Sequence, residues 1–377
     1  MANPVSTHAT AAVRTLAPYQ PGKPVSELER ELGLTDIIKL ASNENPLGPS
    51  ASAVAAIKSA AADSWIYPDG GGFELKGLLA DSLGVRAAQL TLGNGSNDLL
   101  VMLAETFLEP GASAVVSQYA FAVYPTAVTA TGAQLRTARA LPRAHATMPL
   151  GHDLAAMAQL IDATTRLVFI ANPNNPTGTL LPRDELRRFL ENVPADCGVV
   201  LDEAYFEYAR HSGGSDGVAW LAEFPNLVVV RTFSKAFGLA GLRIGYAVSD
   251  PAIADMLNRV RQAFNVSHIG QAAAAAAWQD AAHLAQSIAT VTAGAAQLRQ
   301  DFEQLKLAVI PSAGNFFLVE FGPAALAVYQ GLLREGVIVR PVGNYGLPDF
   351  LRITIGTEAQ NARLLAGLAR VLASLRR

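Results

Sequence analysis

Cysteine is nearly absent from this sequence of 377 residues, which contains only Cys197. A single thiol cannot form an internal disulfide, and its apolar neighbours at positions 199–201 indicate a small buried side chain. Long apolar runs are also missing, since none approaches the roughly 20 residues that span a bilayer. Residues 1–10 lack the cationic start and apolar centre of a secretion signal. These absences favour a cytoplasmic protein that does not enter a membrane.

The sequence also lacks a large excess of positive or negative charge. The formal net charge is -3, which gives no argument for a nucleic-acid or membrane partner, so we expect small metabolites as ligands. With 50% hydrophobic and 16% charged residues the composition is that of a globular protein, and the length leaves room for two domains. The six histidines show no ligand spacing, and we assign them no metal site.

Short apolar runs alternate with helical periodicity over the first two thirds of the sequence. This alternation predicts an α/β fold with a large domain, in which helices cover a mostly parallel sheet. Helices are expected at Asp98–Phe107 and Pro182–Glu191. The expected strands are Gln89–Leu92, Ala114–Ser117, Gln134–Thr137, Leu167–Ala171, Gly198–Leu201, Leu227–Val230 and Ile244–Val248.

The pattern changes after about Pro251 to long helices, including Gln271–Trp278 and Ala282–Leu305. A smaller α+β domain follows, with a closing helix that ends at Leu375 and strands at Phe316–Glu320, Val337–Arg340 and Leu351–Ile355. We therefore predict a large domain over residues 46–268 and a small domain over 269–377, which residues 1–45 join as an arm. The arm packs on the small domain or on a partner subunit.

One lysine emerges at the end of an expected buried strand. Lys235 follows the run Leu227–Val230, at the strand end where open α/β folds bind ligands. Its amine is suited to a Schiff base with an aldehyde cofactor, while Thr232, Ser234 and Arg243 can hold an anionic group of the same molecule. This combination points to pyridoxal phosphate. By itself, the stretch fits an ordinary surface lysine in a Gly-rich turn equally well.

Two further strand ends carry polar residues. Asn172 opens a turn rich in proline and asparagine, and its amide is expected to face the cleft. Asp202 ends a buried strand, where a carboxylate needs a cationic or hydrogen-bonding partner such as a protonated pyridine nitrogen. Tyr205 and Asn172 are expected to form hydrogen bonds with the phenolic oxygen of the same ring. The alternative for Asp202 is a helix cap or a loop ion pair.

A glycine turn lies between an expected strand and an expected helix. Gly95 and Ser96 stand where the helix begins, and backbone N–H groups at such a terminus bind phosphate. The turn is similar to a dinucleotide fingerprint, but Asp98 takes the place of the third glycine, which argues against a nicotinamide cofactor.

The combination of these motifs resembles the fold-type I pyridoxal-phosphate aminotransferases. The residues that carry the resemblance occur in the family's order, namely Asn172, Asp202, Tyr205, Lys235 and Arg243. The segments 39–48 (KLASNENPLG) and 67–70 (YPDG) further resemble the family's histidinol-phosphate branch. The resemblance implies a homodimer with shared active sites, in which Tyr67 reaches the cofactor phosphate of the neighbouring subunit. It also implies that Phe121 stacks on the cofactor ring, although ordinary core packing explains that residue equally well.

Two arginines are expected to recognise substrates. Arg352 lies among apolar residues of an alternating strand and is therefore expected to point into a cleft, where it can bind a phosphate or a carboxylate. Arg340 is a second cation whose alternative is a surface charge at a strand end. By the resemblance, Tyr19 of the arm helps to enclose the substrate.

The activity implied by the resemblance is a ping-pong amino transfer. L-histidinol phosphate and 2-oxoglutarate would be converted reversibly to imidazole-acetol phosphate and L-glutamate, with Lys235 as the proton carrier. Three alternatives remain at this point: an aromatic amino-acid aminotransferase, a pyridoxal-phosphate-dependent phospho-amino-acid decarboxylase and a non-catalytic regulator. A regulator of this kind usually needs a DNA-binding module, and no basic helical extension precedes Arg14 or follows Leu375.

Overall fold

A seven-stranded sheet forms the centre of the larger part of the protein. The computed structural model describes residues 3–18 and 21–375. The strand order is β2 (Leu90–Gly93), β8 (Gly245–Val248), β7 (Leu227–Thr232), β6 (Gly198–Asp202), β5 (Thr165–Ala171), β3 (Ser113–Ser117) and β4 (Gln134–Ala138). The strand β8 runs in the opposite direction to the other six, and the remaining neighbours pair in parallel. The predicted mostly parallel sheet is therefore confirmed.

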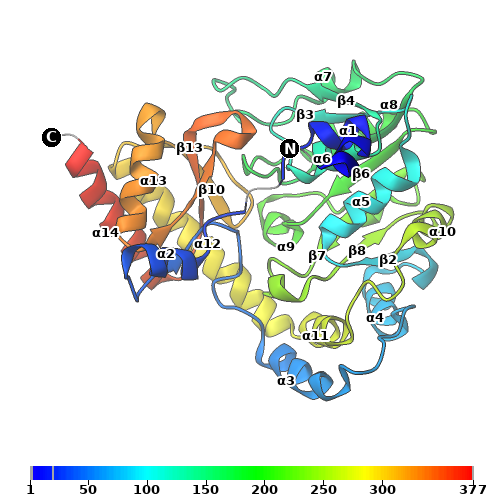
Figure 1. Cartoon of the computed structure of the whole chain (residues 1–377), viewed down its shortest axis with the longest axis horizontal. Coiled ribbons are helices and arrows are strands. Elements are labelled where there is room, and N and C mark those ends of the chain that lie inside the picture. Colours follow the sequence, from blue (N-terminus) through cyan, green and yellow to red (C-terminus); the bar gives the residue numbers. More distant parts are fainter. Residues whose placement is uncertain (1–2, 19–20, 376–377) are drawn as a thin grey trace.

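Helices cover both faces of this sheet (Figure 1). One face carries α4 (Phe73–Leu83), α7 (Leu154–Ala158), α8 (Arg183–Asn192) and α11 (His268–Gln279), and the other carries α5 (Ser96–Phe107), α6 (Val123–Ala130) and α10 (Pro251–Val260). In β5 the side chains alternate between the two cores, with Val168 facing one and Phe169 the other. Because both faces are buried, the central strands are continuous apolar runs in the sequence.

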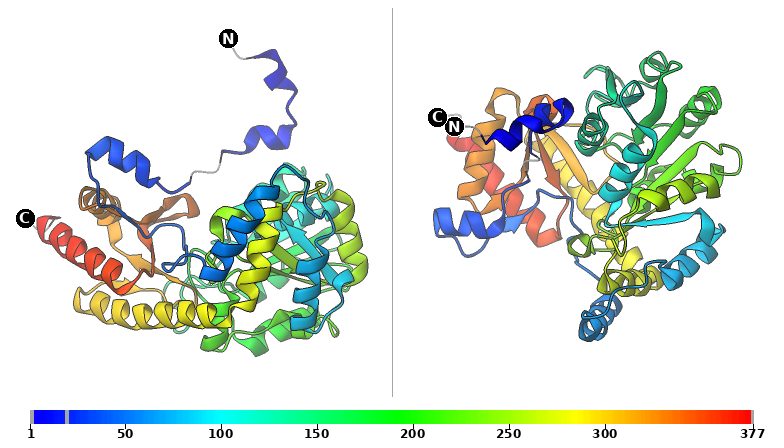
Figure 2. Two further views of the ribbon diagram at one scale, coloured as in Figure 1. Left: turned by 90° about the horizontal axis from the view of Figure 1, so that it is seen from below. Right: turned by 45° about the vertical axis from the view of Figure 1, so that its right-hand side comes forward.

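A four-stranded antiparallel sheet forms the smaller part. Its order is β12 (Arg340–Val342), β13 (Leu347–Thr354), β10 (Phe316–Glu320) and β9 (Ala308–Val309). The helices α13 (Ala325–Arg334) and α14 (Glu358–Leu375) share a hydrophobic core with it. The long helix α12 (Ala281–Gln304) extends from beside α11 in the larger part to this core (Figures 1 and 2).

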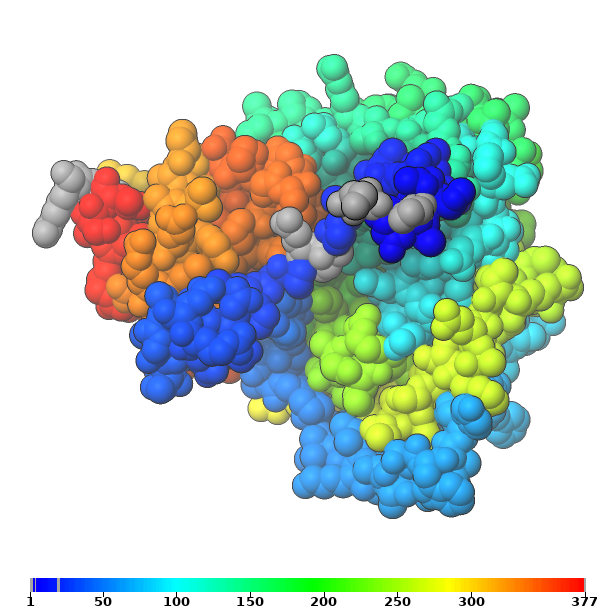
Figure 3. Space-filling model, in the orientation of Figure 1, coloured from blue at the N-terminus to red at the C-terminus, as the bar shows by residue number. Residues whose placement is uncertain are grey.

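The N-terminal segment lies on both parts. Its helix α1 (Ala11–Thr15) contacts α6, and its strand β1 (Ile38–Lys39) pairs with β11 (Val337–Ile338). In Figure 3, residues around α2 (Val25–Leu32) cover the small part, and residues around α1 lie on the large part. The helix α3 (Ala51–Ala60) then packs on α11, and the short α9 (Phe206–Ala209) packs on α12. Domain boundaries at residues 46 and 268 stay a prediction.

One predicted strand is wrong. The apolar run Val337–Arg340 is not a single strand, because β11 pairs with β1 whereas β12 pairs with β13 in the four-stranded sheet. The chain changes partners between Ile338 and Arg340, which periodicity within one segment does not reveal. No helix among the described residues has the length and apolar character needed to cross a membrane.

A buried ion pair ties β6 to β7. Arg231 of β7 is 1% exposed and donates two hydrogen bonds to Glu203, of 2.9 and 2.7 Å, and one of 2.7 Å to Asp216. Its guanidinium lies 3.5 Å from the ring centroid of Phe206. Burial raises the pKa of Glu203, and the positive charge of Arg231 opposes that rise. The pair therefore holds the loop after β6 against the next strand.

We expect Glu203→Ala to lower the free energy of unfolding by about 3 to 5 kcal/mol, because it leaves a buried guanidinium without its main partner. Urea unfolding followed by circular dichroism measures the loss. Glu223→Ala is the matched control, since Glu223 pairs with Arg187 on the surface and its loss should change stability little. Equal effects of the two substitutions would contradict the structural role of the buried pair.

Candidate active site

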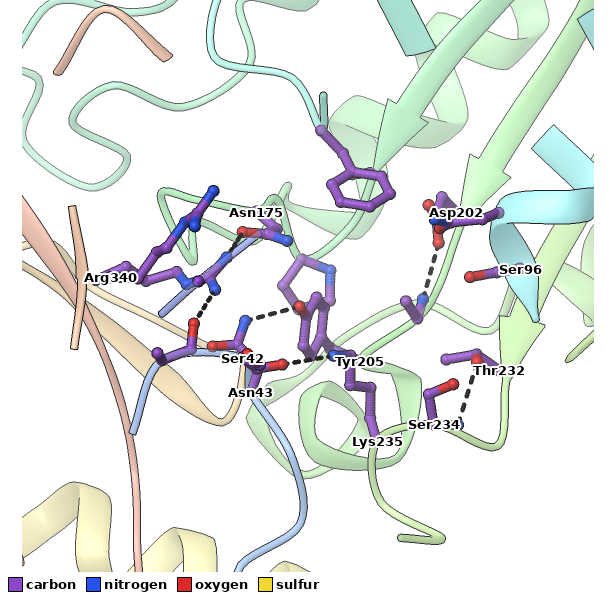
Figure 4. Close-up of a pocket in the computed structure, with 18 of the residues that line it drawn as sticks. Ser42, Asn43, Ser96, Asn175, Asp202, Tyr205, Thr232, Ser234, Lys235 and Arg340 are labelled. Atoms are coloured by element: carbon purple, nitrogen blue, oxygen red, sulfur yellow. Dashed lines mark hydrogen bonds between the residues drawn. The ribbon is translucent and has the colours of Figure 1, made fainter. Parts of the chain in front are cut away.

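A pocket opens at the carboxyl ends of the central strands, next to the small sheet (Figure 4). The parallel register sets Ala171 of β5 opposite Asp202 of β6, and Asp202 opposite Val230 of β7. The polar residues that follow these strands therefore meet at one edge. The pocket is lined by ten of the predicted site residues, namely Ser96, Phe121, Asp202, Tyr205, Thr232, Ser234, Lys235, Arg243, Arg340 and Arg352.

Lys235 lies in the loop that follows β7. Its Nζ donates a hydrogen bond of 3.0 Å to the carbonyl oxygen of Ser42. Burial, together with the smaller effect of the nearby positive charge of Arg352, lowers the pKa of the amine to about 7. A large fraction of the amine is therefore neutral near pH 7, as a nucleophile or a proton acceptor must be.

Asp202 is 5% exposed at the end of β6. Burial raises the pKa of its carboxyl to about 6, while the hydroxyl of Tyr124 and the backbone N–H of Ala204 act in the opposite direction. Tyr124 donates to Oδ2 at 2.7 Å, and Ala204 donates to Oδ1 at 3.1 Å. The sequence indicated that Asp202 needs a partner but did not identify Tyr124, which reaches it from α6.

Tyr205 is held by a residue that the sequence analysis missed. Asn43 donates from Nδ2 to the Tyr205 hydroxyl at 2.9 Å, which leaves the phenolic proton free to be donated elsewhere. The Asn43 side chain accepts a hydrogen bond from Thr354, and its backbone carbonyl accepts one from Asn315. Asn43 has a φ of 56°, a conformation that asparagine tolerates better than most residues. It thus couples the N-terminal segment, the small sheet and Tyr205.

The structure does not bring Asn172 into the pocket. Its Oδ1 accepts the backbone N–H of Leu181 at 2.8 Å, so that the amide closes its own turn. Asn175 lines the pocket instead, and its Oδ1 accepts a hydrogen bond of 2.6 Å from Arg352. The sequence analysis therefore chose the wrong asparagine. Three asparagines stand within four residues, and spacing alone does not show which side chain points outward.

One end of the pocket is suited to an anion such as phosphate. Ser96 begins α5, and Thr232 and Ser234 face it beside Arg243, whose guanidinium donates to the Ser234 hydroxyl at 3.2 Å. Gly95 has a φ of 81°, and a Cβ atom at this position would collide with the Arg243 guanidinium. The glycine turn therefore gives Arg243 its place beside the helix N-terminus, as the phosphate prediction requires.

Two arginines form the opposite end, as Figure 4 shows for Arg340. Arg340 and Arg352 are register partners on β12 and β13, and they are 8% and 7% exposed. Arg352 donates to Asn175 and, at 2.6 Å, to the carbonyl oxygen of Ala41. Two buried cations on neighbouring strands are an arrangement for binding an anionic substrate group. Lys235 and Tyr205 lie between the two ends.

Tyr67 is not among the residues that line this pocket. Tyr67 is 78% exposed and stacks on Phe264, with ring centroids 4.6 Å apart. Tyr19 lies outside the described residues. The cross-subunit role of Tyr67 and the substrate contact of Tyr19 stay predictions.

The comparisons with known proteins agree with this geometry. Residues 35–368 match the family model described as aminotransferase class I and II. Histidinol-phosphate aminotransferase 2 of Pseudomonas fluorescens (strain Pf-5) is 56% identical over 367 residues, which are 97% of each chain. The enzyme of the same name from Methylococcus capsulatus is 53% identical over 98% of this chain and 99% of its own.

Solved structures give the same result. The histidinol-phosphate aminotransferase of Sinorhizobium meliloti, in complex with pyridoxal-5'-phosphate, has a TM-score of 0.88 and 32% identity, with 97% of this chain and 98% of that chain covered. A Thermus thermophilus aspartate aminotransferase at 23% identity shares the fold, with a TM-score of 0.81. The chain is therefore a member of the class I and II aminotransferases, which confirms the predicted fold class. Within that class it belongs to the histidinol-phosphate aminotransferase family.

We expect Lys235→Met to raise the free energy of unfolding of the ligand-free protein at pH 7 to 8 by about 2 to 4 kcal/mol. The folded amine has a pKa of about 7 against 10.5 for an ordinary lysine, so between these values only the unfolded chain binds the proton. Wild-type stability consequently rises with pH over this range. The advantage of the variant should therefore shrink as the pH approaches 10.5.

Urea unfolding at several pH values between 7 and 10 measures this difference. Lys58→Met is the matched control, because Lys58 is exposed on α3 and carries no desolvation cost. An advantage of Lys235→Met that does not change with pH would contradict the pKa assigned to Lys235.

Proposed function

We propose that the protein transfers the amino group of L-histidinol phosphate to 2-oxoglutarate. The products of this reversible reaction are imidazole-acetol phosphate and L-glutamate. The observation that carries the proposal is a partly buried lysine of lowered pKa, which lies between an anion-binding end and a pair of arginines. Relatives named histidinol-phosphate aminotransferase support it at 53 to 56% identity over nearly the whole chain.

The residues at the pocket fit pyridoxal phosphate. Ser96, Thr232, Ser234 and Arg243 would hold its phosphate, and Asp202 would accept the proton on the ring nitrogen. Asn175 and Tyr205 would bind its phenolic oxygen, and Phe121 would pack against the ring. When bound, the cofactor accepts the amino group and withdraws electrons from the substrate carbon. The glycine at position 95 supports this fit, because a side chain there would displace Arg243 from the phosphate end of the pocket.

The protein's own part in the reaction is proton transfer and orientation. The Lys235 amine is neutral enough near pH 7 to take a proton from the substrate carbon and to deliver it to another atom of the reacting molecules. Tyr205 accepts a hydrogen bond from Asn43 and can direct its own proton at the reacting centre. Burial raises the pKa of Tyr205 to about 12, which keeps this proton in place.

We assign recognition of both substrates to the arginine end, the end of the pocket that is formed by Arg340 and Arg352. Histidinol phosphate has no α-carboxylate and offers a phosphate, whereas glutamate and 2-oxoglutarate offer carboxylates. A guanidinium fork pairs with either group. Arg352 is held by Asn175 and by the carbonyl oxygen of Ala41, so it presents its charge in a fixed orientation.

We expect rapid turnover of histidinol phosphate with 2-oxoglutarate, and slow turnover when phenylalanine or tyrosine replaces histidinol phosphate. Glutamate release and the change in cofactor absorbance measure both reactions. Comparable rates with the aromatic amino acids would move the assignment to an aromatic aminotransferase, and release of carbon dioxide would indicate a decarboxylase.

The same assay tests the arginine end. Arg352→Ala should raise KM for both substrates by about tenfold or more, the expected loss for a charge-assisted hydrogen bond. Arg259→Ala is the matched control, because Arg259 is exposed on α10 and pairs with Asp255 on the surface, away from the pocket. A defect confined to one substrate would show that another cation serves the other.

We further propose that the protein is a homodimer with shared active sites and that it acts in the cytoplasm, where its buried thiol Cys197 stays reduced. Exposed aromatic side chains support the dimer, since Trp65 and Phe73 are 82% and 87% exposed. Exposed aromatic side chains are typical of a protein interface. Tyr67 lies in the same stretch of the sequence, is 78% exposed and would complete the pocket of the partner subunit.

We expect Lys235→Ala and Tyr67→Ala subunits, each weak alone, to regain about one quarter of wild-type activity when they are mixed. Half of the randomly formed dimers are mixed, and one of their two sites has both residues intact. Activity after unfolding and refolding of the mixture measures the gain. The control mixture combines Lys235→Ala with Asp202→Ala, which cannot produce an intact site. No gain in the first mixture would contradict the cross-subunit role of Tyr67.

A further inference from the structure

Tyr124 touches the candidate site without lining the pocket. We propose that Tyr124 is a positioning residue, which fixes the Asp202 carboxylate and keeps it ionised for its contact with the cofactor ring. The observation is the hydrogen bond of 2.7 Å from the Tyr124 hydroxyl to Oδ2 of Asp202. The inference rests on the proposed function, and it adds a residue that no motif in the sequence identified.

The ring of Tyr124 is held rigidly. The residue is fully buried and stacks on Phe169 of β5, with ring centroids 5.1 Å apart and an angle of 19° between the planes. Phe121 packs against it edge to face at 5.8 Å. Because two aromatic rings fix the plane of Tyr124, its hydroxyl has a defined place from which to donate. Phe121 lines the pocket, so Tyr124 supports both the carboxylate and the ring expected to cover the cofactor.

The charge balance at Asp202 explains why this support matters. Burial makes ionisation of Asp202 costly and raises its pKa to about 6. Three groups favour the ionised form, namely the Tyr124 hydroxyl, the Ala204 N–H and the Lys235 amine. The other ionisable groups that face Tyr124 are Tyr205 and Tyr345, and burial raises the pKa of Tyr124 well above its usual value. Tyr124 is consequently a donor at every physiological pH.

The hydrogen bond from Tyr124 also affects how Asp202 can bind a further donor. Tyr124 and Ala204 each occupy one oxygen of Asp202, and each oxygen retains a lone pair for a further donor. Without Tyr124 the carboxyl would be protonated at a higher pH and would rotate more freely. It would then accept the proton of a pyridine nitrogen poorly near pH 7.

The test is Tyr124→Phe, which removes one oxygen and keeps the ring packing. In cofactor-free protein labelled with ¹³C at the aspartate carboxyls, we expect the Asp202 titration midpoint to move from about 6 to about 7 or above. The Asp202→Asn variant identifies the signal. We also expect the dissociation constant of pyridoxal phosphate to rise about tenfold or more at pH 7.5.

Tyr208→Phe is the matched control. Tyr208 is also buried, and among the described residues its hydroxyl has no hydrogen-bond partner, so its removal should leave the Asp202 midpoint unchanged. A folded Tyr124→Phe protein with an unchanged or lower midpoint would overturn the proposal. The titration uses protein without cofactor, so its outcome is independent of which amine the enzyme converts. Failure of the proposed function would appear only in the substrate assay.

Discussion

The site depends on the desolvation of two ionisable side chains, the buried Asp202 and the partly buried Lys235, at one edge of the large sheet. Desolvation moves the pKa of Asp202 up to about 6 and that of Lys235 down to about 7. The two groups therefore titrate close to neutral pH, where a proton acceptor and a nucleophilic amine are useful. The parallel register of β5, β6 and β7 delivers both residues to the same edge.

The pocket has an arginine-bearing end on each side, and the two ends come from different parts of the chain. Arg243 and the start of α5 belong to the large sheet, while Arg340 and Arg352 belong to the small one. The N-terminal segment joins them, because Ser42 accepts a hydrogen bond from Lys235 and Asn43 contacts both Tyr205 and Thr354. A shift of the small sheet would thus move the arginines and the support of Tyr205 together. This coupling matches a reaction in which two different anionic substrates bind in turn.

Residues that follow strands were the easiest to predict. Lys235, Asp202 and Ser96 stand beside apolar runs, and the local pattern indicates both the strand and its end. The turn after β5 was harder, because the asparagine that lines the pocket is Asn175 and Asn172 closes the turn. Tyr124 gave no signal, since a tyrosine on an apolar helix face is usually core. The run Val337–Arg340 was divided between two sheets by pairing with distant strands, which a local pattern does not contain.

The sequence by itself determined the alternation of strands and helices, the lysine at a strand end and the family to which the chain belongs. These follow from local periodicity and from short motifs whose residues are close together in the chain. Only the tertiary structure decided which asparagine faces the pocket, that Tyr124 supports Asp202, and that Asn43 supports Tyr205. The physical reason is that these contacts join residues 78 to 177 positions apart. Side-chain direction and burial at such separations are set by the packing of whole elements, and no local pattern encodes them.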